Sequence, residues 1–402
     1  MTKGGKKFQA YELIIPVSLC VLIVAPRISV LLLFMAIVTL TVLPRLRSPI
    51  KIDKVLSILI GLFVIWLTST IFWIEHDPAE YWPAVKASGL LVAGLTLWSI
   101  FPEKNKLCEF VSFRMLVPGV FAGCVIVAVG AIYAVINKTS LWGSFYDDPL
   151  STLNNSAVVI SLFSWVAFEA ALKKSPIIFV LLFILVLGLI LNLSSMAAIG
   201  VIILGSLVLI VRKITGKYGG VMIALIASFL VVLAPYAVSN YTSDPQSQEN
   251  REIFSLPTSA EHRLAMWSFA TEKIDEKPWL GWGFGASRRI PQEDRRLAPN
   301  MEIMPLHPHN LALQTRLELG FPGSLILAGL VFSVFYRLAT FTNDGWISGL
   351  AMAPAAGWLF VANVSYGMWQ SWWIALAFLL AIFMKFALAN LQRSIASPDI
   401  DL

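Results

Sequence analysis

The amino-acid sequence predicts an all-α polytopic membrane protein with about twelve transmembrane helices. Of its 402 residues, 57% are hydrophobic and only 13% are charged, whereas soluble domains carry roughly 25% charged residues. Apolar runs close to the length that spans a bilayer recur along most of the chain, and the strand alternation of an outer-membrane barrel is absent. These observations favour a helical membrane protein over a soluble globular fold.

The apolar runs predict the helices and the domain organisation in chain order. We expect helices one to nine in residues 1–239, a long loop with interfacial helices in residues 240–308, and helices ten to twelve in residues 309–402. The apolar run after the basic start is expected to be the first span, not a cleavable signal peptide. The predicted spans are 11–26, 28–44, 55–74, 85–101, 115–136, 154–172, 176–192, 194–211, 219–239, 309–336, 345–365 and 368–389.

Basic residues in the short connections predict how the chain is oriented. One side holds nearly all of the Lys and Arg, whereas the short connections of the other side hold only Arg27, Lys86 and Lys138. The positive-inside rule therefore predicts cytoplasmic termini and puts the loop at 240–308 on the opposite, periplasmic side. Because ATP and nucleotide sugars stay in the cytoplasm, chemistry on that side needs an activated donor carried by the membrane, or a gradient.

The remaining composition gives no cofactor signal. The net charge of +6 follows from the topology, so we expect membrane lipid and no nucleic acid as a partner. Cys20, Cys108 and Cys124 lie in or beside apolar segments and form no CxxC pair, so we expect neither a disulfide nor a metal site.

The stretch "LHPHNLALQTRLELGFPG" at residues 306–323 introduces polar and ionisable groups at the start of the tenth predicted span. Such groups at membrane depth are expensive and are usually functional. Helical spacing predicts that His309 and Arg316 share a face, while Glu318 points elsewhere and braces a neighbouring helix. His307 is expected on another face, in a secondary role. Gly320 and its neighbours allow a bend.

The segment before it, "HRLAMWSFATEKIDEKPWLGWGFGASRR", predicts an interfacial helix followed by a glycine-rich turn. Arg263 and Trp267 lie on that helix. Three glycines at 281, 283 and 285 permit a close approach of the backbone, and Arg288 and Arg289 follow at once. A plain turn between interfacial helices fits the glycines equally well.

These residue types suit group transfer from a lipid diphosphate. Histidine can take a proton from a hydroxyl near neutral pH, and His309 is the candidate base. Arginine is a permanent cation whose planar fork matches phosphate oxygens. Arg263, Arg288, Arg289 and Arg316 are therefore candidates for holding the diphosphate as it leaves. Alternatively, His309 and Arg316 only anchor a helix end among the lipid headgroups.

Three stretches resemble the O-antigen ligase and polymerase superfamily of bacterial polytopic membrane glycosyltransferases. "HPHNLALQTRLELGFPG" is similar to its H-N-x-x-L-x-x-x-x-E-x-G-x-x-G signature. An Arg-x-x-x-Trp helix followed by Pro-x-x-Gly-x-Gly-x-Gly precedes it, and a Gly-x-Phe motif with an Asn-rich helix start opens a middle span. The matching residues are His309, Asn310, Leu313, Glu318, Gly320 and Gly323; Arg263, Trp267, Pro278, Gly281, Gly283 and Gly285; and Gly143, Phe145, Asn154 and Asn155.

The resemblance implies a GT-C-like, metal-independent glycosyltransferase of the bacterial inner membrane, with its active site in the periplasm. Ligases of the superfamily move a glycan from undecaprenyl diphosphate to a sugar of lipid A-core, with inversion at the anomeric carbon. The resemblance makes His309 the base and Arg263 a diphosphate ligand. It gives Asn310, Glu318, Trp267 and Gly283 supporting roles.

One departure from the family pattern keeps alternatives open. Ligases often have a Ser/Thr-Arg pair where the eighth span begins, whereas this chain has Ser195 and Met196. Any of Arg316, Arg288, Arg289 or Arg27 is a candidate replacement. A polymerase that extends a growing O-antigen or exopolysaccharide glycan is the second interpretation, and a polysaccharide transporter is the third. The single dominant loop favours a ligase, and the absence of an internal repeat argues against a transporter.

Overall fold

The computed structural model describes residues 11–42, 52–74, 81–101, 113–139, 150, 153–193, 195–243, 258–292, 296–298 and 301–396. These residues form helices and the connections between them, together with one small hairpin, in which β1 (Arg296–Ala298) pairs antiparallel with β2 (Met301–Glu302). Cys108, Gly143 and Phe145 lie outside the described residues. The prediction of an all-α architecture is thus supported in the described part of the chain.

The helices follow the apolar runs, and polar side chains cap several of their N-termini. Asp53, Asn310 and Asp344 each accept hydrogen bonds from backbone N–H groups of the helix that follows. The helices are α1 (Tyr11–Val24), α2 (Ser29–Val42), α3 (Lys54–Ser69), α4 (Tyr81–Ile100), α6 (Phe113–Asn137), α7 (Asn154–Lys174), α8 (Pro176–Asn192), α9 (Met196–Ser243), α11 (Thr258–Glu276), α12 (Leu311–Thr340), α13 (Gly345–Val364) and α14 (Ser371–Ala396), with short 3-10 turns η1 (Pro26–Ile28), η3 (Thr70–Phe72) and η6 (Ala286–Arg288).

Several of these helices are long and apolar enough to cross a membrane, which makes the chain a multi-pass membrane protein. Within the described residues there are 7 such helices, and four shorter apolar helices accompany them. Each predicted span overlaps one of the helices. Helix α9 covers two predicted spans, and its backbone breaks between them at Gly216, where φ is 63°. The count of twelve crossings stays a prediction.

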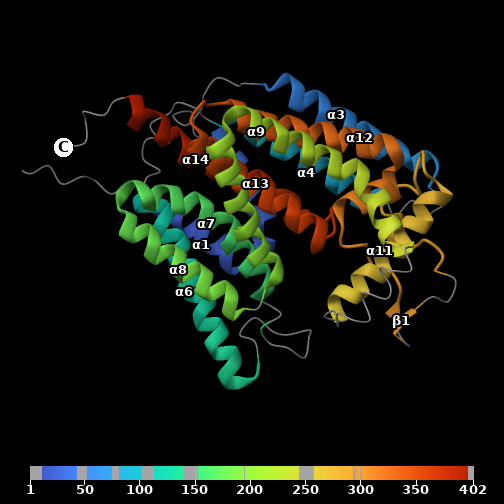
Figure 1. Cartoon of the computed structure of the whole chain (residues 1–402), viewed down its shortest axis with the longest axis horizontal. Helices are drawn as coiled ribbons and strands as arrows, with labels where there is room; N and C mark the ends of the chain where they lie inside the picture. The colour runs from blue at the N-terminus through green and yellow to red at the C-terminus, as the bar shows by residue number, and fades with distance from the viewer. Residues whose placement is uncertain are drawn as a thin grey trace, which may run out of the picture.

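The helices pack into one body, with α11 and β1 gathered at one end (Figure 1). Helices α12 and α13 pack along α9, and α1 packs along α6. Helix α7 lies in the interior, since 89% of its most apolar stretch is buried within the protein. Its neighbours include α6, α8, α9 and α13. The core of the bundle therefore forms around α7, while α11 covers the end of α12 at which the polar stretch begins.

The opposite end of α12 is held by charged groups, of which Arg212 is buried and Arg337 and Asp53 are partly exposed. Arg337 pairs with Asp53, the N-cap of α3. The buried Arg212 donates from Nη2 to the carbonyl oxygens of Ala339 and Thr342, at 3.0 and 3.2 Å. Segments that the sequence predicts on the cytoplasmic side thus lie in contact, and the orientation itself stays a prediction.

Candidate active site

The polar stretch enters α12 through a tight backbone turn. His309 has φ 53°, a left-handed conformation that is uncommon for a residue with a side chain. Asn310 caps the helix, and its Oδ1 accepts the N–H of Leu313 at 3.0 Å. The prediction that His309 shares a helical face with Arg316 is wrong in detail, because His309 precedes the helix and its direction is set by the turn.

The ring of His309 is oriented by a backbone carbonyl from the connection between α13 and α14. Its Nδ1 lies 2.5 Å from the carbonyl oxygen of Ser365. A carbonyl can only accept, so Nδ1 carries the proton and donates it. In the neutral ring the lone pair is then on Nε2. The geometry gives His309 the tautomer that a general base needs.

His307 lies against His309, and its expected place on another face is wrong. The two ring centroids are 4.3 Å apart, and Nδ1 of His307 accepts the backbone N–H of His309 at 3.3 Å. Helical spacing does not apply to these residues, because the turn precedes α12. His307 is 5% exposed. Burial, the neighbouring His309 and the charge of Arg288 lower the pKa of His307 to about 3, so its ring is neutral at physiological pH.

Two of the predicted arginines bring positive charge to this pair of histidines. Burial lowers the pKa of His309, the hydrogen bond to Ser365 opposes that shift, and the charge of Arg263 adds to it. Arg288 acts on His307 in the same way. Burial also lowers the pKa of Arg263, although a guanidinium stays protonated in proteins. The site therefore combines two neutral imidazoles with fixed cations.

Helix α11 is tied directly to the turn that carries His309. Trp267 donates from Nε1 to the carbonyl oxygen of Pro308 at 2.7 Å. Arg263 lies one helical turn before Trp267, so the same helix holds the turn and supplies the cation. Trp267 therefore contacts the turn that carries His309, and its supporting role stays a prediction.

The predicted bend in α12 is confirmed at Gly320, where φ is 64°. The break leaves backbone carbonyls without their partners in the helix. The glycine-rich turn supplies replacements, since Trp282 and Gly283 donate to the carbonyls of Leu317 and Glu318, each at 2.8 Å. Trp66 of α3 donates to the carbonyl of Leu319 at 2.8 Å. The turn is therefore docked on the break.

This docking explains why glycines are needed at the contact. A Cβ on Gly281 would lie 2.6 Å from the backbone nitrogen of Gly320. Gly281 also has φ 70°, so a side chain there would be strained as well as crowded. The sequence left open a plain turn, and the structure instead gives a turn whose backbone is bonded to a membrane helix.

Glu318 joins the glycine turn to the connection after α13. It is fully buried, and each of its oxygens accepts two hydrogen bonds. The donors are Gly285 N at 2.7 Å, Trp369 Nε1 at 2.6 Å, Ser287 Oγ at 2.5 Å and Gln314 Nε2 at 3.1 Å. A carboxylate has about four acceptor positions. All of these positions are filled. Glu318 therefore connects the glycine-rich turn to the segment after α13, as expected of a bracing residue, and has no free acceptor position with which to act as a base.

Arg316 lies in the second turn of α12 and is 5% exposed. Its Nη2 bonds the hydroxyl oxygen of Tyr236 at 3.2 Å, and the guanidinium lies 4.6 Å from the ring of Phe321. Its Nε and Nη1 are buried without a hydrogen-bond partner, and no ion pair to Arg316 is found in the part of the chain that the structure describes. A cation in this setting needs an explanation beyond stability.

The connection between α13 and α14 contains site residues that the sequence analysis missed. It supplies the carbonyl of Ser365 and the indole of Trp369. Tyr366 donates from its hydroxyl to Oδ1 of Asn155 at 2.8 Å, which links the middle motif to the site. A short polar and glycine-containing break between two apolar runs, on the side predicted for His309, is the signal that could have identified this connection.

The other arginine candidates contribute less to the described geometry. The backbone N–H of Arg289 ends η6 by donating to the carbonyl of Ala286 at 2.8 Å. Arg27 is exposed within η1. At the departure from the family pattern Ser195 is buried and the side chain of Met196 is exposed, so that position supplies no cation.

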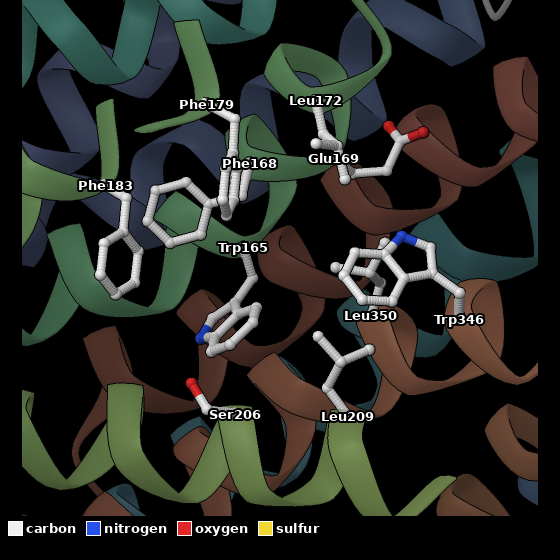
Figure 2. A pocket seen from close by; sticks show the side chains of 10 residues that line it. All are labelled: Trp165, Phe168, Glu169, Leu172, Phe179, Phe183, Ser206, Leu209, Trp346 and Leu350. Carbon is white, nitrogen blue, oxygen red and sulfur yellow. The ribbon is translucent and has the colours of Figure 1, made fainter. Parts of the chain in front are cut away.

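A cavity of about 90 Å³ lies elsewhere in the bundle. Figure 2 shows its lining, which is aromatic and aliphatic apart from Glu169 and Ser206. It reaches Trp346 and Leu350 at the start of α13, whereas the connection that orients His309 follows the end of that helix. A helix of this length spans roughly 30 Å, so the cavity is separate from the histidines.

The arrangement can remove a proton from a hydroxyl and stabilise an anion beside it. The lone pair on Nε2 of His309 is the acceptor, and the charges of Arg263 and Arg288 lie close enough to act on the two histidines. A polar and positively charged end of a membrane bundle, with His309 half-buried and Arg288 exposed, is chemically suited to an anionic, lipid-borne substrate.

Comparisons with known proteins point to the same class. The model of the O-antigen ligase family matches residues 180–328, which include Arg263, His309 and Glu318. Proteins named "Putative polysaccharide ligase" from Rickettsia conorii and Rickettsia bellii are each 29% identical to this chain, over 244 and 247 residues. Each match covers 59% of this chain and 58% of the relative, so the chain spans less than two thirds of these relatives.

The fold and the site define a multi-pass helical membrane protein with a histidine and arginine site at one end of its bundle. The family match and the relatives confirm the resemblance to the O-antigen ligase and polymerase superfamily.

Proposed function

We propose that this chain is an O-antigen ligase. It transfers a glycan from undecaprenyl diphosphate to a sugar hydroxyl of lipid A-core, at the periplasmic face of the bacterial inner membrane. The observation that carries the proposal is the bond from Nδ1 of His309 to the carbonyl of Ser365, which leaves Nε2 free to accept a proton. The named relatives and the matched family model support a ligase.

In the proposed reaction, Nε2 of His309 takes the proton of the acceptor hydroxyl as that oxygen bonds to the anomeric carbon of the donor sugar. The bond from this carbon to the diphosphate oxygen breaks at the same time, and a single displacement inverts the carbon. Undecaprenyl diphosphate leaves, and the proton passes from His309 to solvent. No oxidant, metal or nucleotide enters this balance.

The arginines hold the donor in this proposal. Arg263 and Arg288 lie near the histidines and bind the diphosphate as negative charge develops on it. Arg316 lies two turns deeper and meets the donor on the side of its lipid chain, where the Nε and Nη1 that lack partners could bind phosphate oxygens. Arg289 contributes to the positive potential of the site. Charge that is fixed in advance needs no reorganisation during the reaction.

The supporting residues act through structure. Trp267 and Asn310 fix the turn that carries His309, from α11 and from the start of α12. Gly283 and Glu318 fix the glycine turn against the broken helix. The donor glycan would approach from the end of the bundle that bears α11 and the hairpin (Figure 1).

The test is the lipopolysaccharide of a strain that lacks the gene, measured together with its undecaprenyl-linked glycans. Bare lipid A-core with long glycan left on the lipid carrier is the result that a ligase predicts. Core that carries a single repeat unit would instead identify a polymerase. An unchanged profile would contradict both and move the enzyme to another polysaccharide.

A further inference from the structure

The backbone at His309 is strained, and the structure shows what holds it. Among the described residues, His309 and Lys138 are the two with side chains that have positive φ, at 53° and 52°. Such a conformation persists only where surrounding contacts over-determine it. At His309 those contacts are its own ring bond to Ser365 and the bond from its backbone N–H to His307.

The second of these bonds depends on one atom of His307. The acceptor is Nδ1, 3.3 Å from the backbone nitrogen of His309, and only an imidazole without a proton on Nδ1 can accept there. The two histidines therefore have opposite tautomers. His307 carries its proton on Nε2, whereas His309 carries it on Nδ1.

The ring of His307 packs against the same connection that orients His309. A Cβ on Gly367 would lie 2.5 Å from Cδ2 and 2.6 Å from Nε2 of His307, so the ring packs directly on the backbone of this glycine. Ser365, two residues earlier, receives the hydrogen bond from His309. The connection between α13 and α14 thus contacts both rings. Through its Nδ1, His307 also accepts a hydrogen bond from the backbone of His309.

We propose that His307 is a positioning residue, whose Nδ1 holds the left-handed backbone of His309 and thereby aims the base. This inference rests on the proposed role of His309. The inference goes beyond the role of His309, because it gives one atom of His307 a positioning function that does not require contact with substrate.

Substitution of His307 by Asn or by Gln distinguishes the role of Nδ1 from the role of Nε2. Asn has its oxygen on Cγ, the position of Nδ1, and can accept the N–H of the residue two positions on, as in an Asx turn. Gln reaches the position of Nε2 and lacks an acceptor on Cγ. His307→Asn should thus keep the positioning bond, whereas His307→Gln and His307→Leu should lose it. His262→Gln, on α11, serves as the control for a histidine outside the turn.

The experiment measures transfer by purified protein at varied donor and acceptor concentrations, with thermal unfolding to verify folding. We expect H307N to stay within about threefold of wild type, and H307Q and H307L to lose about 10- to 100-fold in kcat, with both KM values nearly unchanged. If H307L does not fold, the comparison of Asn with Gln still decides. Equal activity of H307N and H307Q, or recovery by Gln alone, would overturn the proposal. His309→Ala, measured in parallel, shows separately whether the underlying base role fails.

Discussion

The Nδ1 atom of His309 lies 2.5 Å from the carbonyl oxygen of Ser365, a residue 56 positions later in the chain. This contact sets the tautomer of the neutral ring, because a carbonyl cannot donate. In that tautomer the lone pair is on Nε2, in a positively charged setting.

The acid limb of the pH profile should lie below the ordinary histidine pKa of 6.5, because burial and the charge of Arg263 lower the pKa of His309. A base works only when unprotonated, so kcat/KM falls as pH decreases through the lowered pKa and is constant above it. Arg263→Gln removes a positive charge, which raises this pKa and shifts the limb to higher pH. The measurement is kcat/KM for the donor against pH, because this ratio reports the pKa of the free enzyme. A limb above 6.5 in the wild type, or no shift in R263Q, would argue against His309 as the titrating base.

Arg263→Ala should weaken use of the donor more than use of the acceptor, because the guanidinium is proposed to hold the diphosphate. Arg263→Lys should restore only part of the loss, since a point charge cannot form the paired bonds of a planar fork. The measurement is the KM for each substrate, with Arg27→Ala as a control at an exposed arginine. A change confined to the acceptor KM would show that the assignment to diphosphate is wrong.

Arg316→Met should reduce donor affinity while leaving stability equal or higher. The side chain is 5% exposed and two of its nitrogens lack partners, and replacing buried charge with an apolar side chain of similar volume is often neutral or stabilising. Donor KM and the thermal midpoint of detergent-purified protein are measured on the same sample. Lower stability with normal donor use would make Arg316 a structural residue.

Glu318→Ala should destabilise the protein, because four donors lose their acceptor within the interior. Leaving a buried donor unpaired costs about 1–3 kcal/mol, and these contributions do not simply add. We expect a loss of at least about 2 kcal/mol, seen as a lower thermal midpoint. Glu261→Gln, on the exposed surface of α11, is the control. A wild-type midpoint for E318A would mean that the glycine turn is not held through this carboxylate.

Gly320→Ala should disrupt the docking of the glycine turn. Gly320 has φ 64°, and a Cβ there would collide with the carbonyl oxygen of Trp279. The left-handed backbone alone costs about 1–2 kcal/mol for alanine. Gly188→Ala, in α8, is the matched control because, among the described residues, no atom beyond its own helix backbone and chain neighbours lies within 4 Å of its Cβ position. Thermal unfolding of both variants tests this, and equal midpoints would contradict the docking.

The helices and the polar stretch could be predicted because their signals are local. Apolar runs mark the helices, and the residues around His309, Glu318 and Arg263 form motifs that are continuous in sequence. The left-handed turn at His309 could not be predicted, because residues with side chains rarely adopt it. The partners Ser365 and Trp369 were missed for another reason. They meet the site only through the packing of α13 and α14 against α12, which no local pattern specifies.

The central claim is that His309 is the base, and the most direct test is glycan transfer by purified protein reconstituted with donor and acceptor. We expect His309→Ala to lower kcat by about 100-fold or more, the usual scale for loss of a general base. The thermal midpoint and the donor KM should stay close to those of wild type. A well-folded H309A protein that transfers glycan at the wild-type rate would contradict the account.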